Sequence, residues 1–283
     1  MEYKQITMTF TSNGKQFTIG SDTLYGITHV EGLEASDITI SMTPIAQYDG
    51  SAVNKVRVEP RSIIIEAEYP ASSGTENIRH WLQSFFTPKN KGSLSVNYCG
   101  TVRKIEYYCS RFKDNRINIF SPLAFSLTLI CPDPWFYDAD EHTTNMVETV
   151  PLLTFPFNSL QGVGITSGAR WRSTEVEIDN TGDDAIGFVT EITANGTIKD
   201  PYIESGAQRV QAKCTLAAND SIVFSTVPLK KDIMLNGEEN TSYYRSSEFF
   251  SLPPGKSTLR VGAASGASNA TTEIRYSFKY MGV

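Results

Sequence analysis

The sequence contains few of the residues that build metal sites and disulfide frameworks. Among its 283 residues are four cysteines and three histidines: Cys99, Cys109, Cys131, Cys214, His29, His80 and His142. No C-x-x-C pair is present and the histidines lie far apart in the chain, so neither a metal site nor a cofactor is expected. We expect the cysteines to be small buried residues, with a Cys99–Cys109 cross-strand disulfide as the alternative.

Basic charge is also scarce. The chain has 25 Lys and Arg residues against 31 Asp and Glu residues, which gives a net charge of −6 and a pI near 5.2. Without a basic excess there is nothing to neutralise phosphates, so sequence-specific nucleic-acid binding is not expected. No apolar run approaches the ~18 residues of a membrane helix, and the charged start MEYKQITMTF lacks the apolar core of a secretory signal.

Motifs of common enzyme classes are absent. The chain has no G-x-G-x-x-G, G-x-x-x-x-G-K-[ST], H-E-x-x-H or G-x-S-x-G. The hypothesis that the chain is an enzyme would rest on the acidic cluster Asp133, Asp138, Asp140 and Glu141, because paired carboxylates can hydrolyse glycosides. These residues follow an apolar strand on an expected exposed linker, where carboxylates are usually solvated, so no enzyme is predicted.

Helical periodicity occurs only once in the first half. Asn77–Phe86 carries Ile78, Trp81, Leu82, Phe85 and Phe86 at helical spacing, with the exposed His80 on the opposite side. Alternating apolar residues predict strands around it, and Asn13-Gly14 and Cys99-Gly100 predict tight turns. The expected strands include Ile6–Phe10, Ile38–Met42, Ser62–Tyr69, Ser93–Tyr98, Val102–Phe112 and Arg116–Phe120. The polar stretch 44–60 between two of them is interpreted as a projecting loop or hairpin arm.

The stretch Pro122–Tyr137 predicts a boundary between two domains. Leu123 to Cys131 alternates as a strand, and the prolines that follow remove two donors from any sheet ladder. We therefore expect an N-terminal domain over 1–134 and a linker plus C-terminal domain over 135–283. The residues of this inter-domain seam are Pro132, Pro134, Trp135, Phe136 and Tyr137. The three aromatics are expected to pack between the domains, with Trp135 largely buried.

The pattern of the second half predicts short strands separated by turns, which is typical of a β-sandwich of jelly-roll or lectin-like type. Turns are expected at Asn180–Asp183 and Asn236-Gly237. Ile274, Tyr276, Phe278 and Tyr280 are expected to form one final strand with Lys279 facing outward. A set of aromatics leaves open a carbohydrate-binding module as an alternative, because aromatic rings stack on sugars. These residues are Trp171, Tyr243, Tyr244, Phe249 and Phe250.

Several segments of the sequence together resemble a known family. They are FSLTLICPDPWFYD, the pair SIIIEAEY and TENIRHWLQSFF, and the later VEIDNTGDDAIGFVTEI and FFSLPPGKSTLRV. With them the chain resembles the distal tail protein family of long-tailed, siphovirus-type bacteriophages and prophages. The resemblance implies a mainly β fold, with a tail-tube-like N-terminal β-sandwich with one flanking helix and a galectin-like or jelly-roll C-terminal β-sandwich.

The same resemblance implies a structural role at the virion tail tip, after assembly in the bacterial cytoplasm. The family forms a homo-hexameric ring, the baseplate hub, between the tail tube protein and the tail-associated or spike protein, with a receptor-binding protein as a further partner. The alternative function is a carbohydrate-binding module that attaches the particle to host cell-wall glycans. For the 44–60 arm we hypothesise contact with a neighbouring subunit or with the tube.

Overall fold

The computed structural model describes residues 5–45, 49–70, 75–116, 118, 121–151, 168–172, 175–239 and 248–283. They form two compact units: unit 1 consists of residues 1–139 with 279–283, and unit 2 of residues 140–278. The sequence places the boundary earlier, after Pro134, and assigns the last residues to the second domain. Contacts instead continue to Ala139 and return at Lys279.

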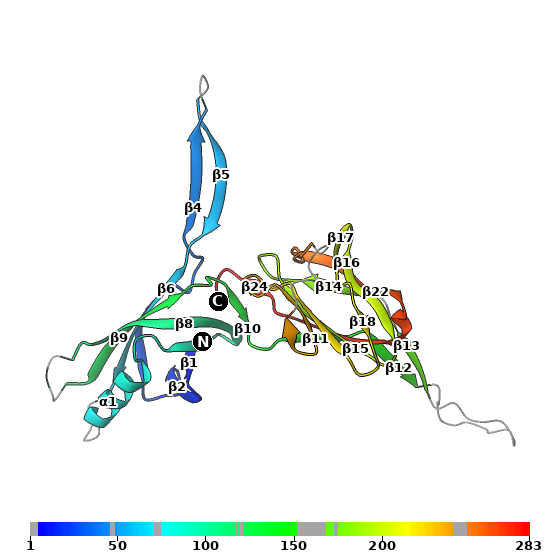
Figure 1. Cartoon of the computed structure of the whole chain (residues 1–283). Helices are drawn as coiled ribbons and strands as arrows, with labels where there is room; N and C mark the ends of the chain where they lie inside the picture. The colour runs from blue at the N-terminus through cyan, green and yellow to red at the C-terminus, as the bar shows by residue number, and fades with distance from the viewer. Residues whose placement is uncertain are drawn as a thin grey trace, which may run out of the picture. The chain divides into compact units, whose positions relative to one another are not determined.

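Unit 1 is built from antiparallel strands and one helix (Figure 1). Its elements are β1 (Ile6–Ser12), β2 (Lys15–Gly20), β3 (Gly26–Glu31), β4 (Ile38–Pro44), β5 (Ser51–Val58), β6 (Arg61–Tyr69), α1 (Thr75–Phe85), β7 (Lys91–Tyr98), β8 (Thr101–Asp114), β9 (Leu123–Cys131), β10 (Phe136–Asp138) and β24 (Lys279–Tyr280). The main sheet has the order β2-β1-β7-β8-β9-β6-β3, β10 pairs with β8, and β24 pairs with β10. The tight turns expected at Asn13-Gly14 and Cys99-Gly100 are confirmed by positive φ at all four residues.

Two of the sequence segments that carry the family resemblance form strands β6 and β9, which pair with each other in unit 1. β6 and β9 run antiparallel over their whole lengths, from Arg61 opposite Cys131 to Tyr69 opposite Leu123. Their alternation buries one face, because successive side chains of a strand point to opposite sides of the sheet. The buried apolar side chains of these two strands are Ile63, Ile65, Ala67, Leu123, Phe125, Leu127, Leu129 and Cys131.

Helix α1 packs against the sheet through the apolar stripe that its sequence predicts. Leu82, Phe85 and Phe86 are buried, and the Phe86 ring meets Phe10 of β1 edge-to-face with 5.2 Å between centroids. Trp81 differs from the prediction because its side chain is 37% exposed. It lies at the border of the stripe, stacked on Phe85 and edge-on to Phe17.

Two predicted strands of the first and last parts of the chain need correction. β8 ends at Asp114, Arg116 lies outside any strand, and most of the expected Arg116–Phe120 strand falls outside the described residues. The expected final strand is wrong as a single element, since β23 ends at Tyr276 and β24 belongs to unit 1. Lys279 does not face outward: it is 8% exposed and pairs with Tyr137 of β10.

Unit 2 is a β-sandwich of antiparallel strands. Its elements are β11 (His142–Asn145), β12 (Val147–Pro151), β13 (Gly168–Arg172), β14 (Glu175–Asn180), β15 (Phe188–Ala194), β16 (Ile198–Ser205), β17 (Gln208–Gln211), β18 (Thr215–Leu216), β19 (Ser221–Ser225), β20 (Asp232–Leu235), β21 (Glu238–Glu239), β22 (Gly255–Ser265), the 3-10 turn η2 (Ala267–Asn269) and β23 (Ala270–Tyr276). One sheet has the order β11-β23-β15-β19-β20-β21 and the other β14-β22-β16-β17, with β18 beside β16 and β12 paired with β13 separately. The mainly β fold class is confirmed.

The two sequence segments of the second half that carry the family resemblance contact each other. The buried Asn180 side chain donates to the carbonyl oxygens of Asp184 (3.0 Å) and Leu252 (3.1 Å) and accepts from the Gly182 amide (3.0 Å). Ile186 and Leu252 exchange backbone hydrogen bonds, and β14 pairs with β22. The Asn180–Asp183 turn is thus confirmed, and it is held by the Leu-Pro-Pro-Gly segment that approaches β22.

Among the described residues, no helix is long and apolar enough to cross a membrane.

Candidate assembly site

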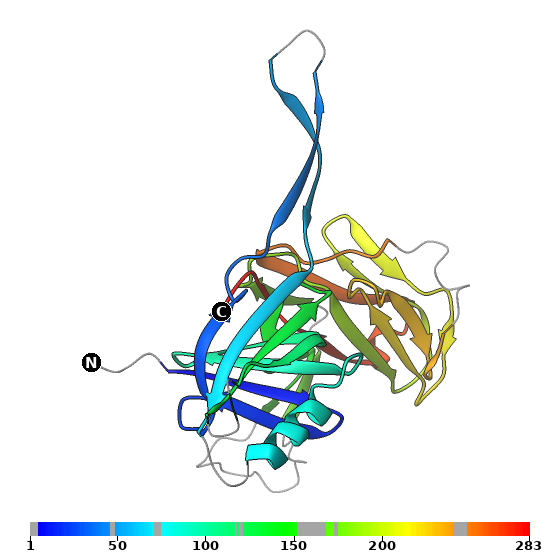
Figure 2. The ribbon, with the colours of Figure 1, turned by 90° about the vertical axis from the view of Figure 1, so that its left-hand side faces the viewer.

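A hairpin formed by β4 and β5 stands away from the rest of unit 1 in both views (Figures 1 and 2). The two strands pair only with each other, from Ile38 opposite Val58 to Pro44 opposite Ser51, with a bulge between Ser41 and Met42. Every residue of β4 is exposed, and so is β5 up to Arg57. We call Ile38–Val58 the arm.

The arm has one apolar face and one polar face. Directly paired residues share a face, so the apolar pairs Ile38–Val58, Ile40–Val56 and Met42–Val53 form one continuous strip. Between 50 and 59% of each of Ile38, Ile40, Met42, Val53 and Val56 is exposed. The opposite face carries Thr39, Ser41, Lys55 and Arg57. An amphipathic hairpin with an uncovered apolar strip is a surface suited to contact with another chain.

The sequence located the arm but misjudged its extent. A projecting loop or hairpin was expected over 44–60, whereas the paired region begins at Ile38. Alternation of Ile38, Ile40 and Met42 is the same in an exposed strand as in a core strand, so it does not distinguish them. The available signal was the set of valines on the returning strand, Val53, Val56 and Val58, which one bulge brings opposite Met42, Ile40 and Ile38.

The predicted seam residues belong to the connector of unit 1. Pro132 is exposed, Pro134, Trp135 and Tyr137 are half-buried, and Phe136 is fully buried. Phe136 lies under the Arg61 guanidinium, whose carbon is 4.7 Å from the ring centroid. Lys279 Nζ lies 5.9 Å from the Trp135 centroid. Packing of the three aromatics against unit 2, with Trp135 largely buried there, stays a prediction.

The acidic residues of the enzyme alternative are held by local partners. Asp138 accepts from Arg103 at 2.6 Å, and Asp133 accepts from the Tyr137 hydroxyl at 2.7 Å. Asp140 and Glu141 are exposed. The contacts of Asp133 and Asp138 thus hold the connector in place.

The described cysteines are all free, so the Cys99–Cys109 disulfide considered above does not form. Cys99 sits in the exposed turn between β7 and β8, whereas Cys109 is buried on β8. Burial raises the pKa of Cys109 to about 11 and that of Cys131 to about 12. Since the thiolate is the reactive form, both are inert structural residues. Among the described residues, no cluster of His, Cys, Asp or Glu could hold a metal ion.

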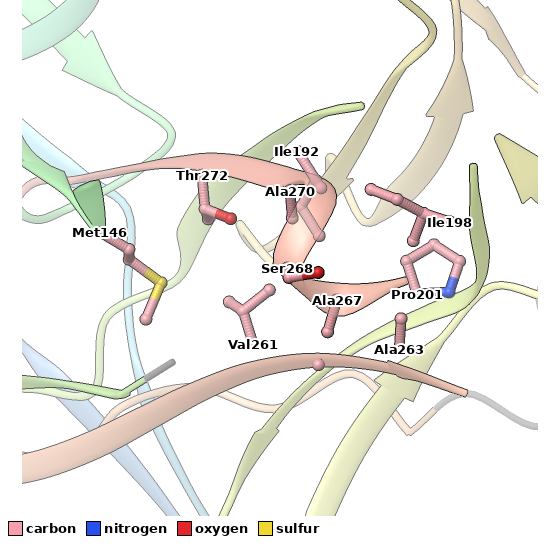
Figure 3. A pocket seen from close by; sticks show the side chains of 11 residues that line it. Met146, Ile192, Ile198, Pro201, Val261, Ala263, Ala267, Ser268, Ala270 and Thr272 are labelled. Atoms are coloured by element: carbon pink, nitrogen blue, oxygen red, sulfur yellow. The ribbon is translucent and has the colours of Figure 1, made fainter. Parts of the chain in front are cut away.

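Unit 2 contains a cavity of about 210 Å³ (Figure 3). Met146, Ile192, Ile198, Pro201 and Val261 surround it, and the hydroxyl-bearing residues of its lining are Ser268 and Thr272. No Asp, Glu, His, Lys, Arg, Cys or Tyr side chain is in this lining.

Of the five aromatics considered for sugar stacking, the structure describes the side chains of two. Phe250 is 3% exposed and packs on Phe188 with 5.3 Å between centroids, so it is part of the core. Phe249 is half-buried. Tyr243 and Tyr244 lie outside the described residues, as does the side chain of Trp171.

These features define a mainly β protein of two compact units, with an arm in unit 1 whose apolar strip is exposed. Residues 181–280 match the family model of the siphovirus-type tail component, C-terminal domain. This match supports the resemblance to the distal tail protein family over that part of the chain. No curated protein sequence matches the chain.

Solved structures support the fold over nearly the whole chain. SPP1 Dit, described as a paradigm of the hub adsorption apparatus in phages that infect Gram-positive bacteria, has a TM-score of 0.67 at 12% identity, covering 96% of this chain and 98% of that one. A chain of the phage P2 baseplate in its activated conformation with Ca has a TM-score of 0.55 at 9% identity, covering 99% of this chain and 100% of that one. At such identities the likeness concerns the fold alone.

Proposed function

We propose that this chain forms a homo-hexameric ring at the tail tip, through unit 1, and joins the tail tube to the tail-tip and receptor-binding apparatus. Two similarities support the proposal: the family match of the second half, and the fold shared with a hub protein and a baseplate chain. A ring requires a head-to-tail contact that closes by rotation. The arm supplies one side of that contact.

The uncovered apolar strip of the arm is the observation that carries this proposal. Ile38, Ile40, Met42, Val53 and Val56 are each about half exposed, and covering the exposed half of such a side chain stabilises by roughly 1 kcal/mol. A hairpin alone is marginally stable in water, so a neighbouring copy that covers the strip would also fix the arm. Each interface of such a ring would bury on the order of 1,200–2,000 Å².

The charge of unit 1 fits a ring through which DNA passes. Unit 1 contains 14 basic and 14 acidic residues, whereas unit 2 contains 11 basic and 17 acidic residues. The whole-chain excess of acid thus lies in unit 2. A neutral ring domain does not bind phosphates through a net positive charge, so a passing nucleic acid is not retained by it.

Mass photometry and negative-stain imaging of the full chain test the proposal. We expect particles of six times the 31.3 kDa chain mass with a central hole. The variant Ile40→Ser/Met42→Ser/Val56→Ser should reduce the hexamer fraction at least tenfold at micromolar concentration. The control Thr39→Ala/Ser41→Ala changes only the opposite face and should leave hexamers intact. Monodisperse monomers of the unmodified chain, or unchanged hexamers of the apolar-face variant, would contradict the proposal.

A further inference from the structure

Arg61 is the first residue of β6 and is 3% exposed. Its guanidinium donates hydrogen bonds to four backbone carbonyl oxygens. Nε donates to Pro134 (2.9 Å), Nη2 to Met281 (2.5 Å), and Nη1 to Gly32 (2.7 Å) and to Glu34. The Phe136 ring covers it. A buried charge is tolerated only when its donors are satisfied, and all three nitrogens of this group donate.

The four carbonyls come from segments that are far apart in the chain. Gly32 and Glu34 belong to the root of the arm where the chain approaches β4, and Arg61 itself lies just after β5, where the chain returns. Pro134 precedes the crossing to unit 2, and Met281 follows the crossing back. One side chain therefore joins both roots of the arm to both connections of unit 2. Every one of these contacts lies within unit 1.

Further contacts hold the same segments in register. Phe136 pairs with Tyr280 and Tyr137 with Lys279 in the β10–β24 ladder. The Arg103 guanidinium carbon lies 3.4 Å from the Tyr280 centroid while its Nη1 binds Asp138. The Val283 amide donates to the Leu33 carbonyl at 3.2 Å. The two connections of unit 2 are thus neighbouring antiparallel strands, and residues 281–283 lie on the root of the arm.

We propose that Arg61 is a positioning residue that couples the arm to the two connections of unit 2. A fixed guanidinium has one geometry that satisfies all four carbonyls, because its donors form a rigid planar fork. Movement of the arm root therefore also breaks the hydrogen bonds of the guanidinium to Pro134 and Met281. Movement of the connections of unit 2 likewise breaks its hydrogen bonds to the arm root. Docking of the arm then restrains the connections of unit 2. The coupling is a property of the single chain and does not depend on ring formation.

Hydrogen exchange of the full chain tests this coupling. In Arg61→Lys the charge is kept, but an ammonium group cannot reach all four carbonyls. Amides of residues 32–36, 133–138 and 279–283 should then exchange at least tenfold faster, as one group. The control Arg79→Gln also removes a partly buried arginine of unit 1, whose guanidinium pairs with Asp114 at 2.6 Å. It should leave these three segments at the rate of the unmodified chain.

A truncation after Tyr280 tests the reverse direction and keeps Arg61 intact. It removes the Met281 acceptor and the Val283–Leu33 bond, so residues 32–36 and 59–61 at the arm root should exchange at least threefold faster. This second variant decides the question if Arg61→Lys does not fold. Unchanged exchange at the arm root in the truncated chain would overturn the proposal. So would faster exchange in Arg61→Lys that is confined to the residues next to position 61.

Discussion

The two units have the same kind of architecture but differ in what they leave exposed. Both are antiparallel β structures with apolar cores. Of the twelve large hydrophobic side chains exposed among the described residues, eleven lie in unit 1, and unit 2 contributes only Leu229. Six of the eleven belong to the arm and its tip: Ile38, Ile40, Met42, Ile45, Val53 and Val56. Exposed apolar surface at one place marks a contact site, so unit 1 has the surface expected of an assembling domain.

The two units also differ in net charge. Unit 1 is balanced, whereas unit 2 carries the whole acidic excess of the chain. A net charge keeps a surface solvated and discourages self-association. The two units thus share one fold class, but their strands carry different outer faces around similar apolar cores.

The largest expected effect tests whether each unit depends on its own core. Phe10→Ala in unit 1 and Phe188→Ala in unit 2 each remove a fully buried ring and should cost about 3–5 kcal/mol. Calorimetry should show two unfolding transitions, with each substitution lowering the temperature of one. Equal shifts of both transitions in either variant would show that the units unfold together.

Two glycines sharpen the comparison because each lies under a tyrosine ring. A Cβ at Gly92 would lie 2.5 Å from Tyr107 and 2.9 Å from the Thr11 carbonyl, and one at Gly262 would lie 2.4 Å from Tyr202. Tyr107 is buried and cannot move, so Gly92→Ala should cost about 1–3 kcal/mol. Tyr202 is half-buried and can swing outward, so Gly262→Ala should cost less. Urea unfolding measures both, and the reverse order would contradict this account.

Alkaline pH should weaken unit 1 through its buried thiols. Burial raises the pKa of Cys109 from 9.0 to about 11 and that of Cys131 to about 12. The unfolded chain releases these protons near pH 9, before the folded unit does, so the stabilisation is complete below pH 9 and is lost as the pH rises toward 11–12. The urea midpoint of unit 1 should fall over this range, and Cys109→Ala/Cys131→Ala should reduce the slope.

The smallest effect concerns exposed ion pairs, where the units should behave alike. Lys91 binds Glu106 at 2.8 Å in unit 1, and Lys256 binds Glu177 at 2.7 Å in unit 2. Water and salt screen such pairs, and their side chains lose rotamer freedom on pairing. Glu106→Gln and Glu177→Gln should leave both unfolding midpoints unchanged within error. A shift in only one unit would reveal a difference that the exposed fractions do not show.

Much of this fold follows from local patterns in the sequence. Alternation predicts β6, β7, β8 and β9 because each has one buried face, and helical spacing predicts α1 with its buried Leu82, Phe85 and Phe86. The Asn236-Gly237 turn is confirmed by positive φ at both residues. The candidate site was only partly predictable. Alternation does not reveal that the arm starts at Ile38, since an unpaired hairpin and a core strand have the same period.

The sequence by itself determined the mainly β fold class, the presence of a projecting arm and the family resemblance. These depend on the order of residues within short segments and on local backbone preferences. Only the tertiary structure decided where residues 279–283 lie, because they contact Arg61, more than two hundred residues earlier, and pair with β10. It also decided that Lys279 is buried and that the acidic excess belongs to unit 2 alone. Such long-range contacts leave no periodic trace in the chain.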